Sequence, residues 1–255
     1  MLTDALKAFF APGGIYEPCS MFTPTHIIAA SAAFVLLVLL FVIFRKRMSD
    51  RSLRNMFRVL APVITLLETI KIFHAFYYGN PTLDEWLPLS YCGLFIFALY
   101  LAGFGKGFLG DCGKSFIAYG APIAGIAFLI FPTTSLMNFP IWHFLSVYSM
   151  FFHSCMLMCG LLLLDRMRMT KKLYLSYCAF VVFFAIPSVI MNCTLSSNLM
   201  NLREPYNIPI KPLHTIYENV PFVYTLLVLI AYMLMPFPTE GAARLCKKCK
   251  KKTAD

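Results

Sequence analysis

Long apolar runs separated by short polar stretches dominate the pattern of the chain. A helix that crosses a membrane needs about 20 predominantly apolar residues, and we read seven of these runs as such helices. The predicted spans are 25–44, 59–78, 87–101, 116–131, 142–164, 173–191 and 221–235. The pattern therefore predicts an all-α membrane protein, a bundle of seven transmembrane helices.

Composition supports this interpretation and excludes a water-soluble protein. Hydrophobic residues make up 59% of the 255 residues, and charged residues make up 13%, against about 25% in an ordinary soluble domain. The seven spans use up so much of the chain that no soluble domain fits beside them. We expect an extracytoplasmic segment (1–24), a seven-helix domain (25–237) and a basic cytoplasmic tail (238–255).

Charge in the loops predicts the orientation of the bundle. All but four of the 22 Lys and Arg residues lie in the first, third and fifth loops and in the tail. Basic loops stay on the cytoplasmic side, so the N-terminus is expected outside and the C-terminus in the cytoplasm. The net charge of +10 then indicates contact between the basic tail and anionic lipid headgroups, and no nucleic acid partner. The predicted location is the cell membrane, as a multi-pass protein.

The cysteines predict neither a disulfide framework nor a metal site. Several of the nine lie inside apolar runs, where cysteine acts as a small hydrophobe. Cys155 and Cys159 are four residues apart but lack the further ligands of a closed metal site, and the tail pair Cys246 and Cys249 lacks a second ligand pair. No metal and no cofactor is predicted.

Three ionisable side chains lie inside the second predicted span, at Glu68, Lys71 and His74. A charge near the centre of a bilayer costs about 2.5 to 3.5 kcal/mol, so each of them calls for a partner or a role. Residues three apart share one helix face and can contact each other. We expect this face to point into the bundle, with Glu68 and Lys71 either neutralised as a packing pair or supporting a functional site.

The predicted orientation brings polar side chains from five spans into the outer half of the bilayer. A rise of about 1.5 Å per residue sets the depth of each one. These residues are His26, His74, Cys92, His153 and Asn192. Their common depth predicts a polar cavity inside the bundle that opens toward the outer side.

Cys92 and His153 are the pair in this group that suggests nucleophilic chemistry. An imidazole can take the proton of a thiol and leave a reactive thiolate. A cysteine in an apolar segment is also typical of packing, and a histidine that faces a bundle is typical of structural hydrogen bonding. The pair is a candidate catalytic centre, with a structural role as the alternative.

The segment Leu-Pro-Leu-Ser-Tyr-Cys that ends at Cys92 resembles the Leu-Pro-Leu-His-x-Cys signature of the YwaF-type integral membrane proteins. Other features occur in a similar order, among them His26, Glu68, His153 and the stretch that contains Asn198. Vertebrate relatives of that family are described as acyltransferases that act on ether phospholipids with a cysteine nucleophile.

The resemblance implies that Cys92 is the nucleophile and His153 the general base. Ser90 departs from the signature, because many members have His there, and the change puts an acid-base role of this position in doubt.

Three functional hypotheses follow. The first is acyl transfer or acyl-ester cleavage on a membrane phospholipid, with Asn192 or Asn198 as oxyanion donor and Glu68 orienting or charge-balancing the site. The second is a small-molecule or ion transporter, in which Glu68, Lys71 and His153 form a polar route. The third is a non-catalytic membrane protein whose polar groups hold the helices together.

Overall fold

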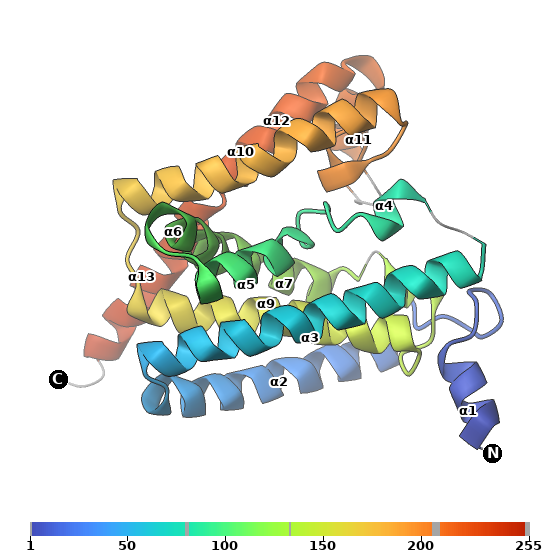
Figure 1. Ribbon diagram of the computed structural model, residues 1–255, viewed down its shortest axis with the longest axis horizontal. Helices are drawn as coiled ribbons and strands as arrows, with labels where there is room; N and C mark the ends of the chain where they lie inside the picture. The colour runs from blue at the N-terminus through green and yellow to red at the C-terminus, as the bar shows by residue number, and fades with distance from the viewer. Residues whose placement is uncertain (1, 80–81, 133, 206–209, 253–255) are drawn as a thin grey trace.

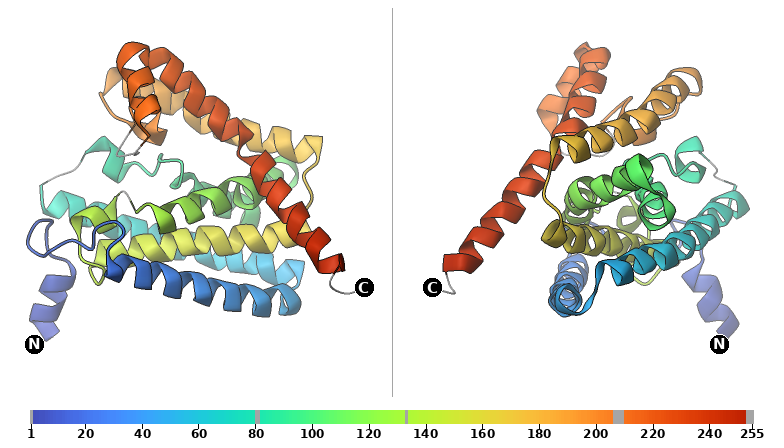
Figure 2. Two further views of the ribbon diagram at one scale, coloured as in Figure 1. Left: turned by 180° about the vertical axis from the view of Figure 1, so that it is seen from behind. Right: turned by 60° about the vertical axis from the view of Figure 1, so that its left-hand side comes forward.

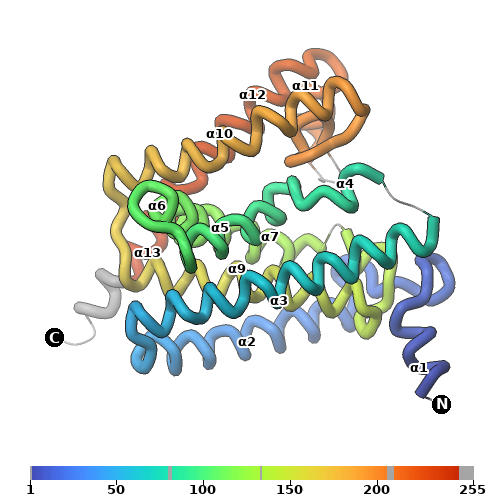
Figure 3. The backbone as a smooth tube through the Cα atoms, in the orientation of Figure 1, coloured from blue at the N-terminus to red at the C-terminus, as the bar shows by residue number. Residues whose placement is uncertain are grey.

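The computed structural model describes residues 2–79, 82–132, 134–205 and 210–252, and these residues form helices and no β-strand. The path of the chain can be followed in Figure 3. The helices are α1 (Leu2–Phe9), α2 (Pro24–Arg47), α3 (Asp50–Tyr77), α4 (Leu83–Trp86), α5 (Leu94–Phe104), α6 (Gly107–Ser115), η1 (Phe116–Gly120), α7 (Ala121–Ile130), α8 (Ser135–Asn138), α9 (Phe144–Arg166), α10 (Lys171–Thr194), η2 (Leu199–Asn201), α11 (Lys211–Asn219), α12 (Pro221–Leu234) and α13 (Pro236–Lys252).

Six helical stretches of the described chain are long and apolar enough to cross a membrane. They are Pro24–Arg47, Asp50–Tyr77, Gly107–Asn138, Phe144–Arg166, Lys171–Thr194 and Pro221–Cys246. The prediction of an all-α, multi-pass membrane architecture is therefore confirmed. The count of seven spans is not confirmed, and the direction of the bundle across the membrane stays a prediction.

The predicted span 87–101 differs from the structure, because its helical part is α5, which has 11 residues. At 1.5 Å per residue α5 is about 16 Å long, against roughly 30 Å of hydrocarbon in a bilayer. Residues 87–93 are not helical. Pro88 cannot donate a backbone hydrogen bond and disfavours helical geometry at Leu87, so the apolar run is interrupted near its start.

In Figure 1, helices α2, α3 and α9 run roughly along the long direction of the molecule, and α10 is inclined to them. Helix α9 packs against α7 and α2, while α5 packs against α3 and α6. Helix α10 contacts α6 and α12. The core therefore lies between α5, η1, α7 and α9, where aromatic and aliphatic side chains are fully buried.

A wide π-helical turn, η1, precedes α7. Pro122 lies in the first turn of α7, and its ring would clash with the carbonyl four residues earlier in a regular helix. The wider turn relieves this clash. The ring of Pro122 then packs against Gly160 of α9, where an added Cβ would lie 2.4 Å from Pro122 Cγ.

The basic loops lie together at one end of the bundle. Arg45 at the end of α2 pairs with Asp165 at the end of α9, at 3.1 Å. Arg54 and Arg58 of α3 both donate to the Gly103 carbonyl near the end of α5, at 2.9 and 2.8 Å. These contacts agree with the charge pattern that places the loops on one side, and they satisfy backbone oxygens at a helix C-terminus.

The predicted basic tail begins inside α13. Thr239 and Glu240, in its first turns, are buried. Thr239 Oγ1 donates to the Tyr119 carbonyl at 2.8 Å, and Glu240 accepts from Arg244 at 2.8 Å. The start of the tail is thus part of the bundle, and residues 253–255 lie outside the described residues.

Candidate functional site

Cys92 lies in the turn that leads into α5. Ser90 begins this turn: its Oγ accepts from the Gly93 N–H at 3.0 Å, and its carbonyl accepts from the Leu94 N–H at 3.1 Å. No described residue accepts a backbone hydrogen bond from the Tyr91 N–H, and the Cys92 N–H lies within hydrogen-bond reach of its own sulfur. The half-buried thiol therefore lies just before the N-terminus of α5, where partial positive charge accumulates.

Glycine at position 93 makes this turn possible. An added Cβ would lie 2.6 Å from the Pro88 carbonyl oxygen, closer than real contacts allow. The Ser90 position, where many members of the resembling family have His, therefore supplies a side-chain hydrogen bond within the turn that precedes α5. Its hydroxyl fixes the turn that carries Cys92.

A cluster of tyrosines surrounds the thiol. The rings of Tyr91 and Tyr232 stack with centroids 4.3 Å apart, and the Cys92 thiol lies within electrostatic range of both phenols. Tyr177 donates to the Tyr232 carbonyl at 2.8 Å, so the 2.8 Å bond between the Tyr91 and Tyr177 hydroxyls runs from Tyr91 to Tyr177. Tyr232 itself donates to the Met200 carbonyl at 2.7 Å. This chain ties α5, α10, α12 and the 195–202 loop together around Cys92.

His153 lies on α9 with its ring stacked on Phe128 of α7, at 3.8 Å between centroids and 7° between planes. Its Nδ1 is 2.8 Å from the Ser149 carbonyl, which accepts only, so Nδ1 carries the proton of the neutral ring. Its Nε2 forms no hydrogen bond with another described residue. The ring is therefore held in the tautomer that leaves Nε2 as an acceptor.

Cys92 and His153 come from adjoining segments, and no hydrogen bond between them is present among the described residues. Phe95, one turn after Cys92, meets Phe152, the residue before His153, with ring centroids 5.7 Å apart. No hydrogen bond joins the thiol and the imidazole among the described residues. The predicted pairing of the two side chains is thus not observed as a direct contact.

The two predicted oxyanion donors are engaged in holding the loop after α10. Asn192 Nδ2 donates to the Leu199 carbonyl at 3.0 Å, and its Oδ1 accepts from Leu199 N–H and Ser197 Oγ at 2.7 and 2.9 Å. Asn198 Oδ1 accepts from Arg203 and Glu204 N–H groups, at 3.1 Å each. Both side chains therefore have a structural role, because these bonds stabilise a loop with positive φ at Ser196, Met200 and Asn201.

Glu68 and Lys71 form the predicted pair, with Lys71 Nζ 2.6 Å from Glu68 Oε1. The other carboxylate oxygen, Oε2, accepts from the Tyr148 hydroxyl of α9 at 2.6 Å. Glu68 is 7% exposed. This carboxylate joins α3 to α9, and sequence reasoning missed Tyr148 as its partner. The signal for it was available, since a phenol in a membrane span needs a hydrogen-bond partner.

His74 does not join this pair, contrary to the expectation that all three side chains meet on one face. Its Nε2 lies 3.2 Å from the carbonyls of both Phe10 and Ala11. His143, which precedes α9, donates from Nε2 to the same Ala11 carbonyl at 2.9 Å. The two imidazole rings are 5.6 Å apart and together hold the chain that follows α1.

His26 also has a structural contact, at the start of α2. Its Nδ1 accepts from the Phe22 N–H at 3.2 Å, and its Nε2 lies 3.1 Å from the Leu129 carbonyl at the end of α7. It therefore links α2 to α7. The hydrogen bonds of the described residues divide the five polar side chains expected at one depth among separate contacts, and the common cavity stays a prediction.

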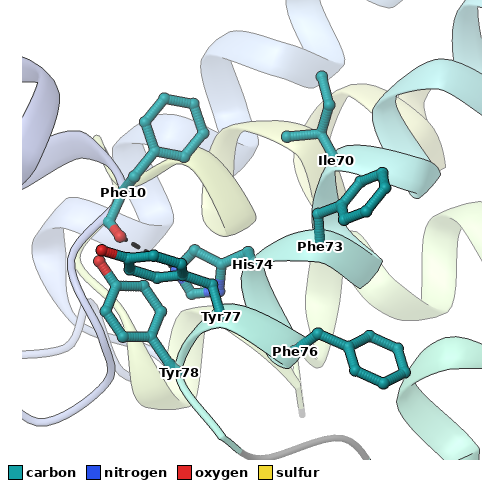
Figure 4. Close-up of a pocket in the computed structure, with 7 residues that line it drawn as sticks. All are labelled: Phe10, Ile70, Phe73, His74, Phe76, Tyr77 and Tyr78. Atoms are coloured by element: carbon teal, nitrogen blue, oxygen red, sulfur yellow. Dashed lines mark hydrogen bonds between the residues drawn. The ribbon is translucent and has the colours of Figure 1, made fainter.

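Neither Cys92 nor His153 lines the two best-defined hollows of the described surface. One of about 560 Å³ lies between Phe10 and the end of α3 (Figure 4). The other, of about 350 Å³, lies between α2 and α7. Among the described residues no cluster of His, Cys, Asp and Glu has the composition of a metal site.

His143 should make the docking of the N-terminal segment dependent on pH. Its Nδ1 accepts from the Leu145 N–H at 3.2 Å, so only the neutral ring makes both bonds. Burial lowers the pKa of His143 below its ordinary value of 6.5, the Ala11 carbonyl opposes this, and His74 lowers it further. The stabilisation by the neutral His143 ring is therefore complete above the ordinary pKa of 6.5, and it is lost as the pH falls through the lowered pKa of the folded protein.

Alkylation of Cys19 measures the release of the N-terminal segment from the bundle, because Cys19 belongs to this segment and is only 7% exposed. Exposed Cys193 serves as the internal control. We expect the Cys19 to Cys193 labelling ratio, read by mass spectrometry, to rise several-fold between neutral pH and about pH 5. The rise should be absent in His143→Gln. An equal ratio at both pH values would contradict the role of His143.

Comparison with known proteins identifies one related group. A family model, that of the TMEM164 family, matches residues 21–237. The matched stretch begins after α1 and ends in the first turn of α13. No curated protein and no solved structure gives a match.

Proposed function

The chain belongs to the TMEM164 family, and from this premise we propose that it is a membrane-embedded lipid acyltransferase or acyl-ester hydrolase with Cys92 as nucleophile. One observation carries the proposal. The interruption of the apolar segment at 87–93 leaves a half-buried thiol just before the N-terminus of α5. Irregular backbone at membrane depth is expected where it is buried in protein or lines a functional cavity.

In the proposal, backbone N–H groups of the turn supply the oxyanion donors that acyl transfer requires. A tetrahedral intermediate carries an oxyanion, and backbone donors that are already oriented stabilise it without reorganisation. The N–H groups of Tyr91 and Cys92 take this role in the proposal, in place of Asn192 and Asn198, whose described hydrogen bonds hold their own loop.

The reaction proceeds in two transfers. His153 Nε2 accepts the thiol proton, and the sulfur attacks the carbonyl carbon of a phospholipid ester. The bond from that carbon to the lipid oxygen breaks, and the lysolipid leaves with the proton as an alcohol. The hydroxyl of an acceptor lipid then attacks the thioester, and its proton returns to the sulfur through His153. Water as the acceptor gives hydrolysis.

The proposal includes an approach of His153 to Cys92 when lipid binds. Catalytic hydrogen bonds are often long without substrate and tighten in the complex. Phe95 and Phe152 connect the two segments, so a small shift of α5 against α9 brings the side chains closer.

In the third membrane segment, the non-helical chain at 87–93 and α5 together cross the bilayer. Headgroup contact by the basic tail stays a prediction.

Acyl exchange in lipid nanodiscs tests the proposal. The purified protein receives phospholipid with a labelled acyl chain and an unlabelled lysophospholipid acceptor. We expect Cys92→Ala to lower exchange at least about 100-fold and His153→Gln by a comparable factor. Cys178→Ala is the matched control, since Cys178 is also half-buried. A labelled adduct that hydroxylamine releases from wild type and not from Cys92→Ala would identify the thioester.

Unchanged exchange in folded Cys92→Ala, with folding checked by thermal melting, would rule out the nucleophile. Solute uptake into proteoliposomes that survives Cys92→Ala and fails in Glu68→Gln would instead favour a transporter.

A further inference from the structure

Helix α1 is short, amphipathic and largely free of the bundle. Its apolar stripe recurs at intervals of three and four, at Leu2, Ala5, Leu6 and Phe9. Leu2 and Leu6 are 77% and 51% exposed. No residue of α1 is buried. A helix with such a stripe needs an apolar surface to cover it.

The direction of α1 fits a membrane surface. It lies at the end of the bundle where α2 begins and α3 ends, and it runs across the long direction of these helices (Figures 1 and 2). Helices α2 and α3 are long and apolar enough to cross a bilayer. If they cross it along their axes, α1 lies close to parallel with the membrane plane, at its boundary.

The apolar stripe of α1 continues onto the side of the bundle. Phe9 and Phe10 both pack against Phe144 at the start of α9, with ring centroids 6.0 and 5.0 Å apart. The carbonyls of Phe10 and Ala11 are held by His74 and His143. The helix is therefore attached at its C-terminal end, and its attachment point lies at the edge of the apolar surface.

The hollow beside this attachment is lined by aromatic side chains. Figure 4 shows Tyr77, the last residue of α3, and Tyr78 after it gathered around His74, with the Phe10 carbonyl on the same side. Tyr77 is 81% exposed and Phe73 is 69% exposed. Nearby, Tyr16 meets Trp142 edge to face. Exposed Tyr and Trp rings are typical of the boundary between hydrocarbon and water, where an apolar ring and a polar tip are both satisfied.

We propose that α1 and this aromatic hollow form a docking surface for the headgroup layer of a phospholipid bilayer, with the Leu2 and Leu6 side turned toward the acyl chains. Asp4 and Lys7 occupy the opposite face of α1 and cancel in charge. Binding therefore depends on apolar burial and does not require anionic lipid. The proposal is independent of the acyl-transfer function, since it concerns α1 and not the Cys92 turn.

Depth-dependent quenching of a single tryptophan tests the surface. The chain has two tryptophans, and Trp86→Phe with Trp142→Phe gives the background for Leu6→Trp. The matched control is Lys7→Trp, one residue on and on the polar face. Both are reconstituted in phosphatidylcholine bilayers that carry bromine on the acyl chain, close to the carbonyl.

We expect bromine to quench Leu6→Trp at least about twofold more than Lys7→Trp, and aqueous iodide to show the reverse order. Leu2→Trp should behave like Leu6→Trp, and it replaces that variant if Leu6→Trp does not fold. Iodide quenching of equal strength at positions 6 and 7 would overturn the proposal, because α1 would then stand in water. Equal bromine quenching at both positions would overturn it as well, because the helix would then have no oriented face.

Discussion

Replacement of Glu68 with Gln is expected to destabilise the protein by about 3 kcal/mol, because it leaves the ammonium of Lys71 without its partner. The pair is short, 2.6 Å, and the carboxylate side chain is 10% exposed. Gln keeps an oxygen for the Tyr148 hydroxyl but carries no charge. The loss of stability therefore measures the effect of removing the charge and not the effect of a change in side-chain shape.

A double-mutant cycle separates pairing from packing. We expect Glu68→Gln with Lys71→Met to recover stability to within about 1 kcal/mol of wild type, since the double replacement leaves no unpaired charge in the bundle. Unfolding in detergent of increasing denaturing strength, followed by circular dichroism, gives the four values. Losses that simply add in the double variant would contradict a direct pair.

Lys172 provides the matched control for this cycle. It also lies 2.6 Å from a carboxylate, that of Asp111, but its side chain is 72% exposed. Exposed pairs contribute about 0 to 1 kcal/mol, so Lys172→Met should cost less than about 1 kcal/mol. The contrast between two pairs of equal length would show that burial decides the effect.

Replacement of Gly160 with Ala is the second change with a large expected effect, a loss of about 2 kcal/mol or more. A Cβ at this position would lie 2.4 Å from Pro122 Cγ and 2.8 Å from the Ile117 carbonyl oxygen. Neither neighbour is a flexible side-chain end. Helix α9 must therefore move away from η1 and α7, and this opens the centre of the core.

Gly241→Ala in α13 is the control, because nothing lies within 4 Å of a Cβ there. Alanine favours a helix by about 1 kcal/mol over glycine, so this variant should be neutral or slightly stabilised. Thermal melting in detergent compares the two variants. A Gly160→Ala protein that melts with the wild type would show that α7 and α9 pack less tightly than the distances indicate.

The membrane class of the protein and much of its helical content could be predicted from the sequence. Apolar runs of sufficient length determine spans because unpaired backbone groups are costly in hydrocarbon. The predicted span 87–101 was less accurate, because hydrophobicity does not report helix geometry. Pro88 indicated that the helix is interrupted near the start of this span. Pro122 does not interrupt its span in the same way, because the wide turn η1 precedes it and the helix continues as α7.

The candidate site could be predicted only in part. The Glu68 and Lys71 pair followed from spacing along one helix, where neighbours are set by the helical period. The contacts of His74 could not be predicted from this spacing, because its partners, the carbonyls of Phe10 and Ala11, come from a segment distant in the sequence. The roles of Asn192 and Asn198 depend in the same way on how their loop folds back on itself.

The sequence by itself determined that this chain is helical, membrane-embedded and basic at one end, because these properties depend on local composition and on the solvent that surrounds each segment. The tertiary structure decided which side chains meet. It joined Glu68 to Tyr148 and surrounded Cys92 with Tyr91 and Tyr232. The physical reason is that contacts between helices depend on packing and on the interruption of a span, and neither is encoded in the apolar period of a single segment.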